Sequence, residues 1–135
     1  MKEQNLYAGI LERIKAITID GIVMVIFIII ATYLLSLFQE VPDSIRIIVF
    51  VFIFFIYDPL FTAFIGGTIG HYLVGIRVKK ESDENKNISF PPAVIRYLIK
   101  TFLGIISLIV VSNNEKRRAL HDYIAGSVVI YKTTK

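Results

Sequence analysis

The chain has 135 residues, of which 55% are hydrophobic and 19% are charged. A soluble domain of this size has about 25% charged residues, and here only five charged side chains lie within residues 16–70. This gathering of apolar residues favours a small integral membrane protein and argues against a soluble enzyme or a chain of several domains. The chain has no cysteine, which excludes disulfides, thiolate catalysis and zinc–thiolate sites.

The 15 Lys and Arg residues outnumber the 11 Asp and Glu residues, and they flank the apolar blocks. Three of the basic residues precede position 16 and eleven follow position 70. No aromatic-basic motif accompanies them, so we expect a membrane, and no nucleic acid, as the partner of this charge. Cytoplasmic loops of membrane proteins carry an excess of Lys and Arg, and the amino terminus and residues 71–92 are therefore predicted to be cytoplasmic.

The first predicted transmembrane helix covers residues 16–38, with Asp20 as its single charged residue. Its 23 residues extend about 34 Å as a helix, enough to cross a hydrocarbon core of about 30 Å. The second covers residues 47–70 and has Asp58 as its single charge. The short polar link between the two predicts an antiparallel transmembrane hairpin.

Two features of the second span suggest special roles. Pro59 follows Asp58 and leaves the carbonyl of Phe55 without its helical hydrogen bond. The resulting kink is either a cation site beside a carboxylate or a packing kink in which Asp58 is protonated or hydrogen-bonded. The span also ends in glycines whose small-xxx-small spacing predicts close helix packing, namely Gly66, Gly67 and Gly70.

A third apolar segment covers residues 93–112, but only residues 101–112 are uncharged. That stretch is short for a span, so we predict a membrane-embedded segment that enters the bilayer without crossing it; a true third span is the alternative. Arg96, Lys100 and Gly104 share one helical stripe. This stripe is expected to face the lipid surface, with its basic groups reaching to the headgroups.

Alternating apolar and charged residues at 75–80 and the β-branched run at 126–131 predict two short strands, which can pair if both are cytoplasmic. The predicted fold class is therefore an all-α membrane protein with a two-helix transmembrane hairpin, a third membrane-embedded helical segment and two short cytoplasmic strands. Residues 10–131 form its single domain, and residues 1–9 and 132–135 are terminal tails.

Asp20 is the strongest candidate for a functional residue, because an intramembrane carboxylate is costly unless it is paired, hydrated or protonated. Arg13 lies two helical turns earlier on the same face, so both can line one polar groove; alternatively, Asp20 only anchors the hairpin through hydrogen bonds. His71 and His121 can titrate near neutral pH, but as surface histidines they more often have no special role. The sequence has no nucleophile elbow, no H-E-x-x-H motif and no metal or cofactor pattern, so no enzyme activity is expected.

Four short motifs stand in a fixed order along the chain: RIKAITID at 13–20, GTIGHYLVGIRV at 67–78, ISF and AVIR within 88–96, and RRALHD followed by AGSVV within 117–129. Together they resemble the RDD family of bacterial membrane proteins. That family is named for one arginine and two aspartates, which fall on Arg13, Asp20 and Asp122 of this chain. The chain departs from the pattern at His71, where the family often has lysine, and at Ser127, where it often has threonine.

The resemblance implies a multi-pass protein of the bacterial inner membrane, and transport, including sodium–proton exchange, has been proposed for some family members. In a first hypothesis, the chain is a small cation- or proton-coupled transporter, or an oligomeric subunit of one. Asp20 and Asp58 then bind the monovalent cation or proton, and Arg13 biases their pKa values. In a second hypothesis, the chain is a non-catalytic scaffold that organises a membrane partner or anionic lipid, and Arg13, Asp20 and Asp122 form a structural polar cluster.

Overall fold

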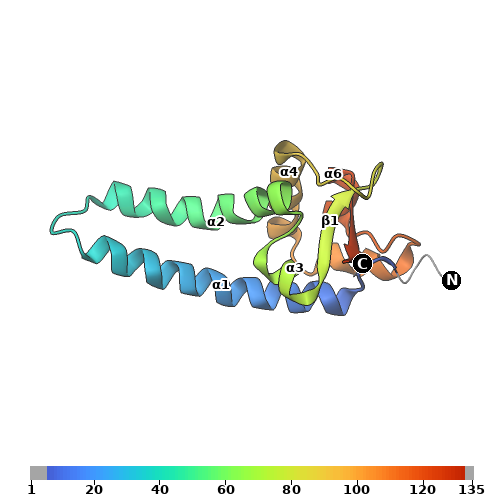
Figure 1. Cartoon of the computed structure of the whole chain (residues 1–135), viewed down its shortest axis with the longest axis horizontal. Helices are drawn as coiled ribbons and strands as arrows, with labels where there is room; N and C mark the ends of the chain where they lie inside the picture. The colour runs from blue at the N-terminus through green and yellow to red at the C-terminus, as the bar shows by residue number, and fades with distance from the viewer. Residues whose placement is uncertain (1–5, 133–135) are drawn as a thin grey trace.

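The computed structural model describes residues 6–132. Two long helices, α1 (Ile10–Ser36) and α2 (Asp43–Ile65), run antiparallel as a hairpin, and both are long and apolar enough to cross a membrane (Figure 1). The predicted hairpin is therefore present. Each helix starts earlier than hydropathy predicted, because hydropathy reports only the apolar part, whereas the helical hydrogen bonds extend into flanking polar residues.

The second predicted span ends five residues earlier than expected, at Ile65. Gly66 caps α2 in the left-handed conformation with φ of 87°, and a new short helix, α3 (Ile69–Val74), begins after Thr68. Gly66 and Gly70 therefore lie on different elements and do not form the predicted small-xxx-small stripe of one helix. Gly70 still mediates a close approach, because a Cβ there would collide with the carbonyl of Ala16 on α1.

Two strands, β1 (Ile76–Lys80) and β2 (Ser127–Tyr131), pair antiparallel with Val78 opposite Val129, as the alternation predicted. Each strand follows a six-residue helix and one left-handed glycine: α3 and Gly75 precede β1, and α6 (Leu120–Ala125) and Gly126 precede β2. The register is symmetric about the equivalent residues Val78 and Val129, so that Ile76 faces Tyr131 and Lys80 faces Ser127. The two helix–glycine–strand units are thus related by a local two-fold arrangement.

The third apolar segment is broken. The helix α4 (Phe90–Leu103) starts with two prolines in its first turn, where proline is tolerated because the first N–H groups have no helical acceptor. After Gly104 the chain turns by 103° into α5 (Ile106–Ile109) and the 3-10 turn η2 (Val110–Asn113). Such a pair is either one broken span or a re-entrant segment. Figure 1 shows α4 running across the end of the hairpin.

The chain before and the chain after this broken segment meet in one sheet. Lys80, before it, and Ser127, after it, are register partners in the sheet. A segment whose flanking residues pair with each other enters and leaves on one side, so the sheet favours the re-entrant arrangement over a third crossing. The elements from α3 to β2, packed at one end of the hairpin (Figure 1), are called the head below.

Burial is inverted relative to a soluble protein. Most large apolar side chains of α1 and α2 are exposed, including Ile22, Ile29, Phe52 and Phe64. Exposed apolar surface of this extent is typical of lipid-facing helices. A small apolar core lies in the head, where the sheet meets α1 and α4, with Ala16, Ile76, Val78, Ile88, Ala93 and Val129 among its members. The remaining buried positions, at the junction of hairpin and head, are largely polar.

Candidate functional site: a buried polar layer

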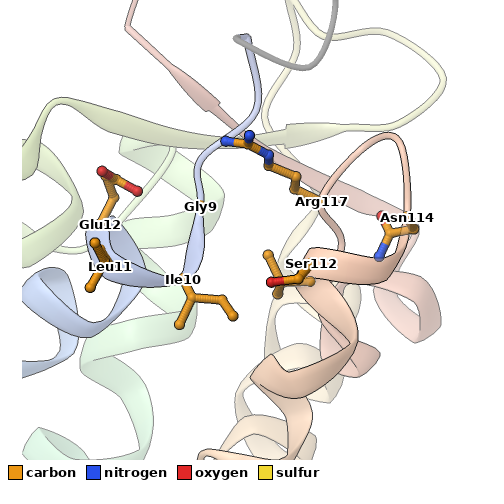
Figure 2. Close-up of a pocket in the computed structure, with 8 residues that line it drawn as sticks. Gly9, Ile10, Leu11, Glu12, Ser112, Asn114 and Arg117 are labelled. Carbon is orange, nitrogen blue, oxygen red and sulfur yellow. The ribbon is translucent and has the colours of Figure 1, made fainter. Parts of the chain in front are cut away.

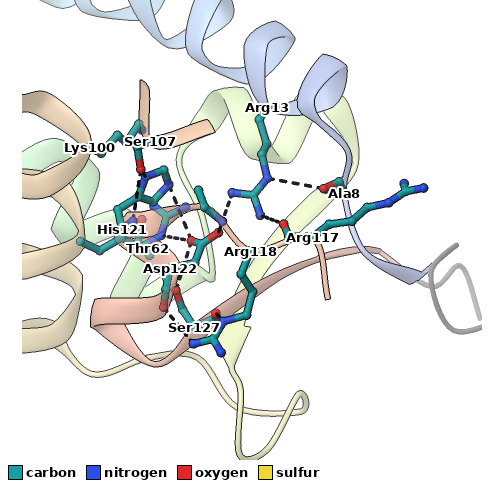
Figure 3. A network of polar contacts seen from close by, with 12 residues as sticks. Ala8, Arg13, Thr62, Lys100, Ser107, Arg117, Arg118, His121, Asp122 and Ser127 are labelled. Atoms are coloured by element: carbon teal, nitrogen blue, oxygen red, sulfur yellow. Dashed lines mark hydrogen bonds and ion pairs between the residues drawn. The ribbon is translucent and has the colours of Figure 1, made fainter. Parts of the chain in front are cut away.

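The centre of this polar layer is a carboxylate held by two arginines. Asp122 of α6 accepts from Arg13 Nη1 of α1 at 2.7 Å, as Figure 3 shows. It also accepts from Arg96 Nε of α4 at 3.0 Å. All three side chains are at most 3% exposed. Burial alone raises the pKa of Asp122, but the charges of Arg13 and Arg96 outweigh it and hold that pKa well below the usual carboxyl range. Asp122 is therefore an anion that joins three elements.

Further hydrogen bonds fix this cluster. Asp122 also accepts from the backbone N–H of Ala119 at 3.1 Å and from Ser127 Oγ at 3.3 Å. Arg13 uses Nη2 to donate to the carbonyl of Arg117 at 2.8 Å. Because each partner is buried, loss of one would leave the others charged and unpaired in a dry environment. The arrangement is therefore suited to holding α1, α4 and α6 together.

Two residues of the predicted lipid-facing stripe instead point inward, so that expectation is wrong. Arg96 is 1% exposed and bound to Asp122, and Lys100 Nζ lies 2.7 Å from Asp58 Oδ2. Snorkelling to the headgroups is unnecessary where a buried carboxylate compensates the charge. The four-residue spacing identified a common helix face but could not tell whether that face meets lipid or protein.

Asp58, one of the predicted ion-binding residues, joins α2 to α4. Its Oδ2 is paired with Lys100, and its Oδ1 accepts from Thr62 Oγ1 at 3.3 Å. One turn away, the Tyr97 hydroxyl donates to the carbonyl of Phe54 on α2. Of the two interpretations of this kink, the geometry matches a hydrogen-bonded, ion-paired carboxylate, because both oxygens of Asp58 have partners.

Asp20 faces a different set of groups. Its Oδ1 accepts from Tyr57 OH at 2.9 Å and from the backbone N–H of Gly70 at 2.8 Å, and its Oδ2 accepts from Thr68 Oγ1 at 2.5 Å. Asp20 thus ties α1 to α2 and α3. The structure does not bring it together with Arg13, which turns toward Asp122, so the two do not share a groove as expected.

The charge on Asp20 has no basic side-chain partner. Within residues 6–132, no Lys or Arg nitrogen lies within 4.0 Å of its carboxylate, and the nearest titratable nitrogen is His71 Nδ1 at 4.0 Å. The carboxylate side chain is 13% exposed. Asp58 and Asp122 are both paired with bases at 3.0 Å or less. Asp20 is therefore the least compensated of the three carboxylates in the layer.

The two histidines are buried, so their interpretation as surface residues is wrong. His71 Nδ1 lies 2.6 Å from Thr68 Oγ1, and His121 Nδ1 lies 2.6 Å from Ser107 Oγ. Burial, followed by the positive charges of Lys100 and Arg96, lowers the pKa of His71 well below 6.5. Burial and the charge of Arg96 lower the pKa of His121 to about 3. Both rings are therefore neutral near pH 7.

The layer balances its charge as a whole. Three bases of this layer, Arg13, Arg96 and Lys100, lie among three carboxylates, Asp20, Asp58 and Asp122. With both histidines neutral, the sum is zero when all six are ionised. These six charged groups lie at the junction of hairpin and head, where they are paired or hydrogen-bonded, while the apolar side chains of α1 and α2 face outward. Arg96 Nη1 is the one buried side-chain nitrogen or oxygen within residues 6–132 without a hydrogen-bond partner.

A separate cavity of about 350 Å³ lies between the start of α1 and the end of η2 (Figure 2). Gly9, Ser112 and Arg117 are among its lining residues. Arg117 uses Nη1 to donate to the carbonyl of Tyr7 at 3.3 Å, and Glu12 lines the same cavity. None of the predicted site residues borders it, and its one acid offsets its one base. We assign it no role.

A hairpin of two apolar helices closed at one end by a buried polar layer defines an integral membrane protein. A model of the RDD family matches residues 7–126, and the chain belongs to that family. It is similar to the uncharacterized protein YckC of Bacillus subtilis (strain 168), with 32% identity over 139 aligned residues that cover 96% of this chain and 89% of that protein. No solved structure matches the chain. The family predicted from the four motifs is therefore confirmed.

Sequence reasoning found Arg13, Asp20 and Asp122 but missed most of their partners. Tyr57 and Thr68 bind Asp20, Arg96 binds Asp122, and Ser107 binds His121. One signal was available. The three predicted apolar segments contain two bases, Arg96 and Lys100, and two carboxylates, Asp20 and Asp58, which is the balance expected if each charge is compensated inside the protein.

Proposed function

We propose that the protein is a small cation- or proton-coupled transporter, or a subunit of one, in which Asp20 is the exchangeable site. The observation that supports this is the contrast among the three carboxylates in the layer. Asp58 and Asp122 are each paired with a base, whereas Asp20 is held by neutral donors and is partly exposed. A membrane-embedded carboxylate without a fixed counter-charge is suited to binding a mobile cation or proton.

The groups around Asp20 are suited to binding either a cation or a proton. The hydroxyl oxygens of Tyr57 and Thr68 lie beside the carboxylate, and carboxylate and hydroxyl oxygens are hard donors of the kind that alkali and alkaline-earth cations prefer. Thr68 also connects to His71 Nδ1. Because Thr68 donates its one hydroxyl hydrogen to Asp20, His71 donates from Nδ1 to Thr68. The resulting His71–Thr68–Asp20 chain offers a route for proton transfer.

The structure changes two parts of the transport hypothesis. Asp58 and Arg13 are already engaged, with Lys100 and Asp122, so in this proposal they position the helices and do not bind the ion in turn with Asp20. Two spanning helices cannot enclose a pathway alone, and the exposed apolar faces of α1 and α2 are where we place contacts between copies or with a membrane partner. In this proposal the protein lies in the bacterial inner membrane, and the excess of basic residues in the head supports a topology with the amino terminus and the head in the cytoplasm.

The proposal is tested in liposomes that contain the purified protein and an internal pH dye. External sodium or potassium should produce a pH change with the wild type, and Asp20→Asn should abolish it while the protein still inserts. Asp83→Asn is the matched control, since Asp83 is an exposed carboxylate of the head and should leave flux unchanged. A folded wild type without any cation-dependent pH change, or full flux in Asp20→Asn, would overturn the proposal.

A non-enzymatic scaffold is the second candidate, and the Arg13–Asp122–Arg96 cluster favours it. These residues are almost completely buried and connect three elements, which is a structural arrangement. If scaffolding is the function, loss of Arg13 or Asp122 lowers the amount of protein and of any co-purifying partner, and Asp20→Asn has no effect on ion flux because there is none. Partner capture from membranes with intact wild type, compared with Arg13→Gln, distinguishes this candidate from the first.

A further inference from the structure

A second site adjoins the Asp20 site at α3, and the two share Thr68, which lines the groove described next and donates to Asp20. An apolar groove of about 360 Å³ runs along the junction of α2 and α3, and its lining includes Phe61, Ile65, Ile69, Tyr72 and Leu73. Ile65 is the last residue of a spanning helix, so the groove lies at the depth where hydrocarbon meets headgroups. Leu73 is 68% exposed, and an exposed apolar groove at this depth is accessible to a lipid chain.

One wall of the groove carries positive charge. The ring of Tyr72 lies beneath the guanidinium of Arg77, whose Cζ is 3.6 Å from the ring centroid. Lys132 Nζ lies 5.5 Å from the same centroid. Tyr72 therefore connects the apolar groove to two cations, in the amphipathic arrangement by which tyrosine and basic residues sit at a membrane interface.

Arg77 is unusual because it is buried without a counter-charge. It is 7% exposed, and its Nη1 donates to the carbonyls of Ile76 at 2.7 Å and His71 at 3.4 Å. Within residues 6–132 it makes no ion pair, and neither does Lys132. Nε and Nη2 of Arg77 also make no hydrogen bond in that part of the chain, and since Arg96 Nη1 is the one fully buried side-chain nitrogen or oxygen there without a partner, these two nitrogens are accessible from outside. Buried charges in proteins are as a rule paired.

A second arginine–tyrosine stack in the head allows a comparison with Arg77 and Tyr72. Arg118 stacks on Tyr123 with its Cζ 4.2 Å from the ring centroid, and it is as buried as Arg77. Arg118, however, is paired with Glu81 at 2.9 Å. Of the two arginine–tyrosine stacks, one is neutralised by a carboxylate of the chain. The other arginine, Arg77, lies beside an apolar groove, and its Nε and Nη2 have no acceptor within residues 6–132.

We propose that this face binds one anionic phospholipid, with an acyl chain in the groove between α2 and α3 and the phosphate at Arg77 and Lys132. Charge complementarity identifies the headgroup, because the free donors are cationic and a phosphate accepts from them. The apolar groove indicates that the ligand also has an acyl chain, because a soluble phosphate has no apolar part that could contact Phe61, Ile65 and Leu73. The residues that carry this inference, Leu73, Arg77 and Lys132, make no hydrogen bond or ion pair with Asp20, so lipid binding can be tested separately from ion transport.

The test measures lipid binding to the full-length protein in detergent, by native mass spectrometry and by the shift in Tm. Phosphatidylglycerol is compared with phosphatidylcholine of the same chains. Phosphatidylglycerol should bind and raise the Tm of the wild type. Lys132→Gln should weaken binding about fivefold, as expected for one basic residue near an anionic surface, and Leu73→Trp should weaken it by filling the groove.

Lys86→Gln is the matched control, because the Lys86 side chain is 72% exposed, lies in the head outside the groove and is paired with Asp83 alone. It removes the same charge and should bind phosphatidylglycerol as the wild type does. Arg77→Gln is added as the stronger variant, but the inference does not depend on its folding, since Lys132 and Leu73 are exposed. Wild-type binding by both Lys132→Gln and Leu73→Trp would overturn the proposal. Equal binding of phosphatidylcholine, or equal stabilisation by inorganic phosphate alone, would overturn it as well.

Discussion

Arg13 Nη1 lies 2.7 Å from Asp122 Oδ2, and this one ion pair joins the first spanning helix to the last helix of the chain. Arg96 of α4 holds the other oxygen of the same carboxylate. The packing of the head against α1 therefore depends on the Asp122 carboxylate, whose position is not determined by any local preference for helix or strand. Three segments that are far apart in the chain must come together before any of the three charges is compensated.

Loss of Asp122 should cost more stability than loss of Arg13. Asp122→Asn leaves two buried guanidinium groups without their counter-charge, whereas Arg13→Gln leaves the pair of Asp122 with Arg96 intact. Breaking a buried ion pair from one side costs about 3–5 kcal/mol, and we expect Asp122→Asn to reach or exceed this range and Arg13→Gln to fall below it. Thermal and chemical unfolding in detergent measure both. Asp83→Asn, which removes the exposed pair with Lys86, should leave Tm nearly unchanged. A Tm for Asp122→Asn that matches this control would contradict the structural role of the cluster.

Asp58 and Lys100 should show strong energetic coupling. Their side chains are 7% and 17% exposed, and they join α2 to α4 at 2.7 Å. Each single variant, Asp58→Asn or Lys100→Gln, leaves one uncompensated charge, and the double variant leaves none. The double variant should therefore be more stable than the sum of the singles predicts, by about 1–3 kcal/mol. A double-mutant cycle from unfolding curves gives this value, and an additive result would mean that the pair does not form.

The hairpin and the strands could be predicted because their signals are local. The apolar runs that contain Asp20 and Asp58 identify the spans whatever the rest of the chain does, and the alternation at 76–80 identifies β1. The inward direction of Arg96 could not be predicted in this way. Spacing along a helix defines a face, and only the positions of distant carboxylates decide whether that face meets lipid or protein.

The end of the second span was mispredicted although its signal was present. Gly66 and Gly67 are followed by Thr68, whose side chain accepts from the backbone N–H of His71 and caps α3. A left-handed glycine ends a helix and a threonine begins the next, so these residues encode a break. Hydropathy masked it, because the apolar run continues to position 70. The burial of His71 follows from this break, since it turns α3 back against α1.

Acidification should destabilise the protein through His121. Its pKa falls from 6.5 to about 3 on folding, so the unfolded chain binds more protons between these values. The stability it contributes is complete above pH 6.5 and is lost as the pH falls toward 3. His71 acts in the same direction. We expect the free energy of unfolding to fall below pH 6.5 by up to about 1.4 kcal/mol per pH unit for each histidine. His121→Gln keeps a polar side chain beside Ser107 and should make the slope shallower. Equal slopes in the two proteins would show that His121 is not buried as a neutral ring.

The contact of α3 with α1 can be tested with two glycines of the same chain. A Cβ at Gly70 would collide with the carbonyl of Ala16 and lie 2.7 Å from Asp20 Cγ, whereas a Cβ at Gly21 meets nothing within 4 Å. Gly70→Ala should destabilise the protein by about 1–3 kcal/mol, since backbone cannot yield to an added methyl group as a side chain can. Gly21→Ala, in the middle of α1, should be neutral or stabilise by up to about 1 kcal/mol through its higher helix propensity. Unfolding in detergent measures both, and a Gly70→Ala protein as stable as Gly21→Ala would mean that α3 does not pack against α1 at Asp20. Ion flux in the same two variants then tests whether transport needs the donors around Asp20 as well as its carboxylate, because Gly70→Ala displaces these donors and keeps the carboxylate.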